Sequence, residues 1–138
     1  MYTSYRSECW KTKSTGNTGG KQMPINEYMQ RLDSNGYAPS IMDTTANLCY
    51  LCGATTPTER HEVFGGPLRN KSKSLGLWVN LCPGCHRTSP FAVHQDAGEA
   101  AELKHFTQMV AMDHYRWSMD EWKRRFYKNY LFMEEENV

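Results

Sequence analysis

Hydrophobic residues follow two different patterns along the chain. In the middle of the sequence apolar positions alternate with polar ones, and Leu77, Val79 and Leu81 share one face of a run from 75 to 81. Successive side chains on a strand point to opposite faces, so this run predicts a strand. A similar run from 58 to 64 predicts a second strand.

The last part of the chain instead shows helical spacing. Residues 97–113 predict a helix whose core positions are Ala100, Leu103, Phe106, Met109 and Val110. Ser118, followed three residues later by Glu121, is typical of a capped helix start. We expect Trp122 and Phe126 on the buried side of this second helix. The aromatic and methionine positions of both helices are interpreted as core rather than as cofactor contacts.

Three further segments complete the expected organisation. Residues 1–23 are rich in Ser, Thr, Gly, Asn and Lys, and they are expected to be disordered because they offer little apolar surface to bury. Residues 25–32 predict a short helix, and a polar, basic loop is expected over 68–74. Asn129 is expected to end the last helix.

Length and charge limit the classes that remain. The chain has 138 residues, enough for one compact domain. No stretch approaches the ~20 apolar residues of a membrane helix, so we expect a soluble, cytoplasmic protein without a membrane partner. Net charge is +1, but residues 49–95 carry five Lys and Arg against two Glu, whereas residues 96–138 carry six against nine Asp and Glu. The basic excess therefore lies in the segment that also holds two cysteine pairs.

Cysteine spacing is the most specific signal. Two C-x-x-C pairs, separated by 29 residues, are formed by Cys49, Cys52, Cys82 and Cys85. Thiolates bind zinc tetrahedrally, and each two-residue gap lets both sulfurs reach one ion. Four sulfurs leave no open position for a substrate, so the predicted zinc is structural. Cys9 lies outside the pairs and is interpreted as a free thiol.

Three histidines are expected near this zinc. His61 lies on the first predicted strand, His86 directly follows the second cysteine pair, and His94 lies in the next loop. If both pairs bind one ion, the segments that carry His61 and His86 must lie side by side. Imidazole binds divalent metals and titrates near neutrality, so it is suited to metal binding and to proton transfer.

The order of motifs resembles the HNH nucleases, in particular the small phage- and prophage-associated ones with a zinc-stapled ββα-metal fold. The resemblance spans about residues 40–131 and is carried by RHEVFGG (60–66), RNKS (69–72), GL (76–77), LCPGCH (81–86), AVH (92–94) and KNYL (128–131). It implies an α+β fold with a small ββα core, a four-cysteine zinc site and helices after it. Residues 1–39 would form an N-terminal extension and 132–138 an acidic tail.

The same resemblance implies a metal-dependent DNA endonuclease of a phage or its bacterial host. A structural Zn²⁺ would be accompanied by a catalytic divalent cation, Mg²⁺ or another, and His86 matches the metal-ligand histidine after the second cysteine pair. His61 falls on the histidine-bearing strand, as a base or ligand. Glu62 stands where many members have a second such residue, and either residue could be the base, with His61 favoured. His94 is a further candidate ligand or phosphate contact.

Two points depart from the family or stay open. The usual position of the middle motif asparagine holds Leu77, and Asn70 and Asn80 are both candidate substitutes. Candidate contacts to the DNA backbone are the basic residues Arg60, Arg69, Lys71, Lys73 and Arg87. An alternative function is a non-catalytic zinc module that binds nucleic acid or protein. A third is an interaction protein that docks onto a phage assembly through its N-terminal extension or C-terminal helices.

Overall fold

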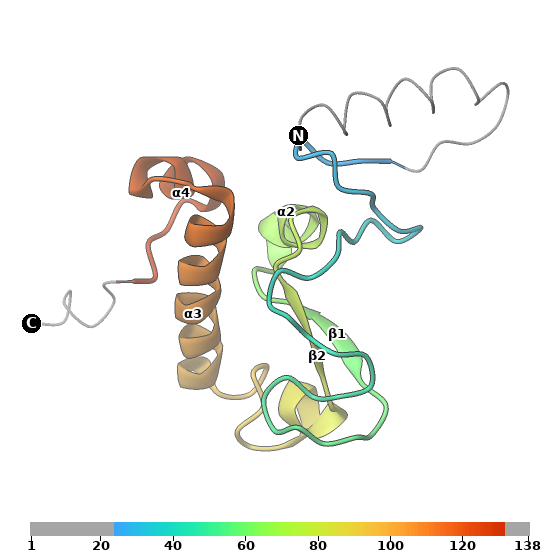
Figure 1. Ribbon diagram of the computed structural model, residues 1–138. Coiled ribbons are helices and arrows are strands. Elements are labelled where there is room, and N and C mark those ends of the chain that lie inside the picture. The colour runs from blue at the N-terminus through green and yellow to red at the C-terminus, as the bar shows by residue number, and fades with distance from the viewer. Residues whose placement is uncertain (1–23, 132–138) are drawn as a thin grey trace, which may run out of the picture.

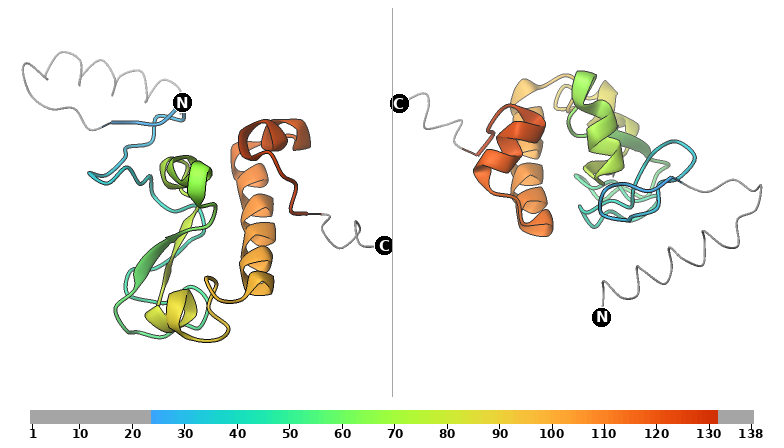
Figure 2. Two further views of the ribbon diagram at one scale, coloured as in Figure 1. Left: turned by 180° about the vertical axis from the view of Figure 1, so that it is seen from behind. Right: turned by 90° about the horizontal axis from the view of Figure 1, so that it is seen from above.

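The computed structural model describes residues 24–131 and shows a small α+β protein. Its elements follow one another as β1 (Glu59–Glu62), a 3₁₀ turn (Gly66–Leu68), α2 (Arg69–Ser74), β2 (Trp78–Leu81), the short π-type helix η2 (Gly84–Thr88), α3 (Ala97–Tyr115) and α4 (Met119–Phe126). The β1–β2 ribbon lies between α3 and α4 on one side and the segment that precedes β1 on the other (Figures 1 and 2). In the part of the chain described here, no helix combines the length and apolar character needed to cross a membrane.

The two strands pair antiparallel, and their register divides the side chains between two faces. His61 pairs with Val79, and Glu59 pairs with Leu81. Val79 and Leu81 are fully buried in the hydrophobic core, so Glu59 and His61 share the core face of the ribbon. Trp78, the partner of Glu62, belongs to the opposite face. Both strands lie inside the runs expected from the sequence and are shorter than those runs.

The segment before β1 covers this opposite face through backbone contacts. The backbone N–H of Ile41 donates to the carbonyl of Gly76 at 2.9 Å, and the indole N–H of Trp78 donates to the carbonyl of Ala38 at 2.8 Å. Gly76 has φ +77°, and a Cβ there would lie 2.3 Å from the carbonyl oxygen of Pro39. Only glycine accommodates both that backbone conformation and this close approach.

The prediction of a helix over residues 25–32 is wrong. These residues form a tight loop closed by a bridge between Ile25 and Arg31. The side chain of Asn26 organises the loop, because its Oδ1 accepts from the backbone N–H groups of Tyr28 and Gln30 at 2.9 and 3.0 Å. An asparagine side chain that bonds its own neighbouring backbone competes with helix formation.

The basic loop expected over 68–74 is instead largely helical, as α2. Ser72 is completely buried there, and its hydroxyl accepts from the backbone N–H of Phe64 at 3.2 Å. Lys71 reaches across to donate to the carbonyl of Arg125 at 2.6 Å. The polar sequence of this segment therefore did not indicate that Lys71 and Ser72 connect α2 to the rest of the fold.

Helix α3 has the expected position but a different buried face. Leu103 is buried, as expected, whereas Phe106 and Met109 are 46% and 47% exposed. Gln108 is fully buried in their place, and its side chain accepts from the backbone N–H of Tyr130 at 2.7 Å and donates to Asn129 at 3.0 Å. A polar residue tolerates burial when its hydrogen bonds are satisfied.

The start and buried face of α4 agree with the sequence expectation. Ser118 caps the helix by accepting from the backbone N–H of Glu121 at 3.1 Å, and Trp122 and Phe126 are buried. The helix ends at Phe126 rather than at Asn129. The amide oxygen of Asn129 instead accepts from the buried Gln108 of α3.

Candidate metal centres

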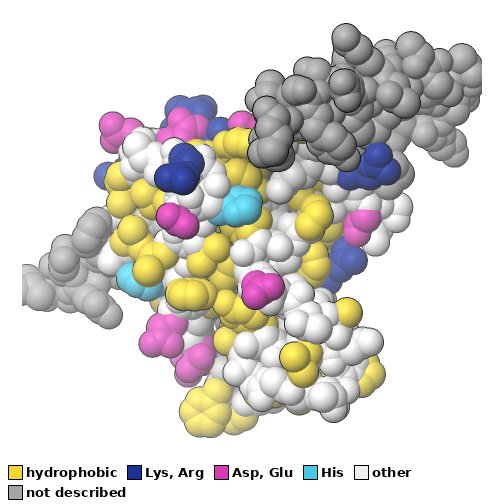
Figure 3. Space-filling model, viewed as in Figure 1, with side chains coloured by type: hydrophobic (Ala, Val, Ile, Leu, Met, Phe, Trp, Pro, Cys, Tyr) yellow, Lys and Arg dark blue, Asp and Glu magenta, His cyan; other side chains and the backbone are white. Residues whose placement is uncertain are grey.

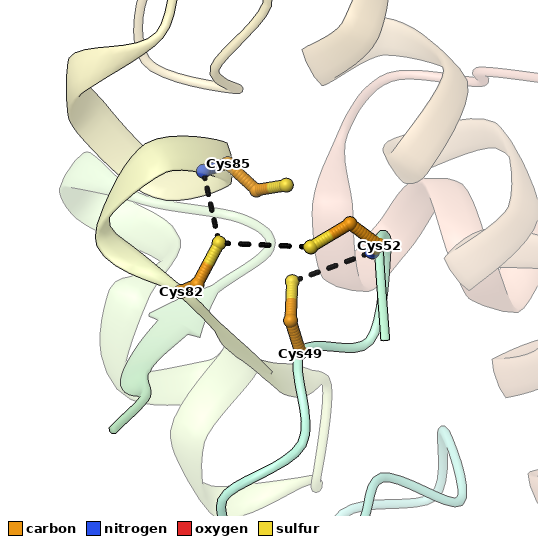
Figure 4. Close-up of side chains that lie close together, drawn as sticks. All are labelled: Cys49, Cys52, Cys82 and Cys85. Atoms are coloured by element: carbon orange, nitrogen blue, oxygen red, sulfur yellow. Dashed lines mark hydrogen bonds between the residues drawn. The ribbon is translucent and has the colours of Figure 1, made fainter. Parts of the chain in front are cut away.

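Four cysteines meet at the start of η2. The residues are Cys49, Cys52, Cys82 and Cys85. We call them the four-cysteine cluster, and their sulfur atoms all lie within 4.8 Å of one another. Figure 4 shows the sulfurs pointing into one common space, two from the loop before β1 and two from the segment that begins η2. Cys9 lies outside the described residues.

The geometry of this cluster is compatible with zinc. The sulfurs of Cys52 and Cys82 are 3.8 Å apart, and a tetrahedral site with Zn–S bonds of about 2.3 Å separates its sulfurs by roughly 3.8 Å. In each pair, the second cysteine donates its backbone N–H to the first sulfur at 3.4 Å. Such donors stabilise thiolate charge, as a metal ligand requires.

The thiols of this cluster have divergent pKa values. Burial acts to raise the pKa of Cys49, but backbone N–H donors outweigh it and lower this pKa to about 6. The pKa of Cys85 is raised by burial and by the neighbouring thiols. Sulfurs packed this closely repel one another as thiolates, and a divalent cation between them removes that repulsion.

A second group of ligands lies beside the first. His61, His86 and His94, the three-histidine cluster, offer ring nitrogens that all lie within 4.8 Å of one another. Each comes from a different segment: β1, η2 and the loop before α3. The backbone N–H of Val93 donates to the carbonyl of Cys85 at 2.9 Å, and this return of the loop onto η2 sets His94 beside His86.

The arrangement of the three rings is that of side chains around a common point. The Nε2 atoms of His86 and His94 are 3.1 Å apart, and the ring of His61 lies 5.2 and 5.1 Å from the other two ring centres. Two nitrogens bound to one ion at about 2.0–2.1 Å in tetrahedral geometry lie roughly 3.3 Å apart. The donor set therefore fits a divalent cation that accepts imidazole ligands.

Burial lowers the pKa of two of the three histidines. His61 is 8% exposed, and its pKa is lowered to about 3, first by burial and then by the neighbouring His86, His94 and Lys104. The pKa of His94 is also lowered, by burial and by the charges of His86 and Arg87. His61 is thus neutral near pH 7, the form that binds a metal or accepts a proton.

Glu59 completes the surroundings of the cluster, and the sequence analysis did not single it out. Its carboxylate accepts from Nδ1 of His86 at 2.7 Å and from Arg87 at 3.0 and 2.6 Å. These hydrogen bonds, that of Arg87 first, lower the pKa of Glu59 to about 2. Glu59 lies two residues before His61 on a predicted strand, so the period of two was the signal that placed both on one face.

Glu62 lies away from the three histidines. It is the last residue of β1, and its carboxylate accepts from the hydroxyl of Tyr37 and pairs with Arg69 at 3.2 Å. Its charge still acts to raise the pKa of His94. Strand alternation thus places the two candidates for the base, His61 and Glu62, on opposite faces of the ribbon. Of these two, only His61 belongs to the three-histidine cluster.

Among the described residues, no hydrogen bond links either candidate asparagine to the three-histidine cluster. Asn70 is exposed on α2, and the side chain of Asn80 donates to the carbonyl of Thr45 at 3.4 Å. Leu77, at the usual motif position, is fully buried in the core.

The five basic residues considered for DNA contacts all have partners within the protein. Arg60 pairs with Asp33 at 2.9 Å and lies 4.3 Å over the ring of Tyr37, and Lys73 lies 4.8 Å from the same ring. Arg69 pairs with Glu62, Arg87 pairs with Glu59, and Lys71 donates to a backbone carbonyl. In Figure 3 the basic side chains are spread around the viewed face rather than gathered into one patch.

Comparison with protein-family models, with curated proteins and with solved structures finds no match to this chain.

Proposed function

We propose that this protein is a metal-dependent phosphodiesterase that cleaves DNA at the three-histidine cluster, on an HNH-like scaffold held by a structural zinc. The observation that carries the proposal is the meeting of His61, His86 and His94 from three separate segments, with their ring nitrogens within 4.8 Å. His61 is buried, His86 is bound to a carboxylate and His94 is exposed. The cluster is therefore closed on the side of His61 and open to solvent on the side of His94.

The three histidines take two different roles in this proposal. His86 and His94 would hold the cation through their Nε2 atoms, which lie 3.1 Å apart. His61 is neutral and buried, and it would take the proton from the attacking water. Its lowered pKa makes it a weak base, and the negative charge of a bound phosphate would raise that pKa toward neutrality. A bound divalent cation would stabilise the negative charge that develops on the phosphate and on the leaving oxygen. Imidazole donors suit Zn²⁺ or Ni²⁺ better than Mg²⁺, which prefers oxygen ligands.

Contacts to the DNA backbone in this proposal come chiefly from Arg69 and Arg87, whose side chains are more exposed than that of Arg60. Both are more than half exposed, at 60% and 52% of the side chain. A phosphate can bind either guanidinium without displacing its carboxylate partner, because arginine carries five N–H donors and each ion pair uses only some of them. The proposed substrate is DNA in the cytoplasm of a bacterium or a phage-infected cell.

The test is cleavage of supercoiled plasmid by purified protein with EDTA, Mg²⁺, Mn²⁺, Ni²⁺ or Zn²⁺. We expect metal-dependent nicking that is lost in His61→Ala and His86→Ala and retained in His114→Ala, a histidine outside the cluster. Absence of cleavage with every metal, in protein that keeps its structural zinc, would overturn the proposal.

A second candidate function is a non-catalytic zinc module that binds nucleic acid or protein. The observation in its favour is that Glu62 is bound to Tyr37 and Arg69, so that within residues 24–131 no carboxylate joins the nitrogen ligands of the three-histidine cluster. DNA binding without cleavage under any of the metals above would select this function.

A further inference from the structure

Glu59 holds the imidazole of His86 through an interaction that fixes which ring nitrogen carries the proton. A carboxylate only accepts hydrogen bonds, so the 2.7 Å contact requires Nδ1 of His86 to carry the hydrogen. In the neutral ring the other nitrogen, Nε2, then has a free lone pair. Nε2 is the atom that faces His94 at 3.1 Å. The lone pair of His86 is therefore directed into the cluster.

Arg87 keeps the carboxylate in place. It donates Nε to Oε1 of Glu59 at 3.0 Å and Nη2 to Oε2 at 2.6 Å. This two-point contact orients the plane of the carboxylate and leaves Oε1 shared with the imidazole of His86. The carboxylate of Glu59 thus accepts hydrogen bonds from two consecutive residues of η2, His86 and Arg87.

The fold explains why these groups meet. Glu59 begins β1 and shares the core face of the ribbon with His61. The cysteine pair of Cys82 and Cys85 starts η2, so a metal bound there fixes the next residues, His86 and Arg87, over the beginning of β1. The carboxylate and the imidazole therefore connect the two segments that a metal in the three-histidine cluster would also connect.

We propose that Glu59 is a positioning residue for the metal of the three-histidine cluster: it selects the tautomer of His86 in which Nε2 binds the cation, and Arg87 orients it. This inference rests on the proposed metal site and extends it to the groups around the ligands. Carboxylates that accept from a ligand histidine raise the basicity of that ligand, and their loss costs metal affinity.

The first measurement is the tautomer of His86 by ¹⁵N NMR of histidine-labelled protein with only the structural zinc bound. The wild type is expected to show the Nδ1–H form of His86 at pH 7.5. Glu59→Ala is expected to show a mixture of tautomers, and Glu59→Gln, which keeps an acceptor oxygen, an intermediate state. An unchanged His86 signal in Glu59→Ala would overturn the positioning role. A role of Glu59 in stability alone leaves this signal unchanged.

The second measurement is the binding of a second Zn²⁺ by calorimetry. Zinc is used as the probe because the four-cysteine cluster is already filled with zinc, so exchange at that cluster does not change its metal. We expect the affinity to fall about 10–100-fold in Glu59→Ala and by less in Glu59→Gln. Glu102→Gln, which removes an exposed negative charge from α3, is the matched control and should bind like the wild type. Equal affinity in all four proteins would overturn the inference while the metal site stands.

Failure of the proposed function gives a different pattern. If the wild type binds no second Zn²⁺, the metal site is wrong, and the NMR measurement still decides whether Glu59 fixes the His86 tautomer. Circular dichroism and a content of one zinc per chain verify that the Glu59 variants are folded before either measurement is interpreted.

Discussion

The four-cysteine cluster and the three-histidine cluster are neighbours in the chain but differ in every property that matters for function. Cys85 and His86 are consecutive residues of η2. The cysteine cluster offers four sulfurs, with hydrogen bonds from backbone N–H groups inside each pair. The histidine cluster offers three nitrogens, an exposed member in His94 and a carboxylate behind His86.

In the proposed function this difference gives the two clusters different tasks. A site closed by four sulfurs satisfies a tetrahedral ion completely, whereas the two imidazole ligands proposed for the second site, His86 and His94, leave positions for water or substrate. Because one short helix carries ligands of both clusters, the first site can position the second without taking part in its chemistry. The comparison therefore predicts that disrupting the first site removes the fold, whereas disrupting the second removes metal binding and activity but leaves the protein folded.

The largest effect is expected from Cys82→Ser. Structural zinc contributes binding free energy on the order of 10 kcal/mol, comparable with the whole stability of a small domain, about 5–15 kcal/mol. The variant should lose its zinc and its cooperative thermal transition, measured by elemental analysis and circular dichroism. Cys9→Ser, the cysteine outside the two pairs, should keep one zinc per chain. A zinc-free Cys82→Ser protein that melts like the wild type would contradict the assignment.

His86→Ala should separate function from fold. Its cysteine neighbours are untouched, so one zinc per chain and a cooperative transition should remain. Loss of a ligand should abolish binding of a second Zn²⁺ and reduce plasmid cleavage by about 100-fold or more. His114→Ala is the control for removal of an exposed imidazole. Loss of the structural zinc in His86→Ala would show that the two clusters are not independent.

The two clusters also differ in how far the sequence predicted them. The spacing of the cysteine pairs was sufficient to predict the first, because two C-x-x-C turns have few geometric solutions. His61, His86 and His94 were recognised as candidates, and the cysteine pairs predicted that His61 and His86 would lie side by side. Glu59 was missed because strand alternation places it on the face of His61 but does not show that His86 and Arg87 lie over that face. Its role emerges only when η2 is set over β1.

The elements show the same limit on prediction. Alternation located the strands and helical spacing located α3, because both patterns are local. The buried face of α3 was wrong, since Gln108 is buried by hydrogen bonds to residues 129 and 130, and that partnership depends on tertiary structure. Asn26 changed a predicted helix into a loop in the same way, through side-chain contacts to the backbone.

Acidification is expected to lower the stability of the protein through His61. The pKa of His61 is about 3 in the folded protein and about 6.5 in an unfolded chain, so the fold favours the neutral ring. The stability that depends on this neutral ring is fully present above pH 6.5 and is lost as the pH falls from 6.5 toward 3. By pH 5 the loss amounts to about 2 kcal/mol.

Urea unfolding of the wild type and His61→Gln between pH 7.5 and pH 5 measures this effect. The wild type should lose more stability than the variant over that range, and the difference between the two slopes isolates His61 from acid effects on the cysteine thiolates. Zinc content is verified at each pH. Parallel slopes would contradict the assignment of the depressed pKa to His61.

The smallest effect is expected from Glu62→Gln, and it decides between the two candidate bases. Glu62 binds Tyr37 and Arg69 on the other side of the ribbon from His61, so its loss should reduce plasmid cleavage by only a few-fold at most. Stability should fall by about 1 kcal/mol or less, as for partly exposed ion pairs. Tyr37→Phe removes one of the same contacts and keeps the carboxylate, so it separates the charge from the hydrogen bond. If Glu62→Gln were as inactive as His61→Ala while Tyr37→Phe stayed active, Glu62 would be the base, and the division of the ribbon into two functional faces would be wrong.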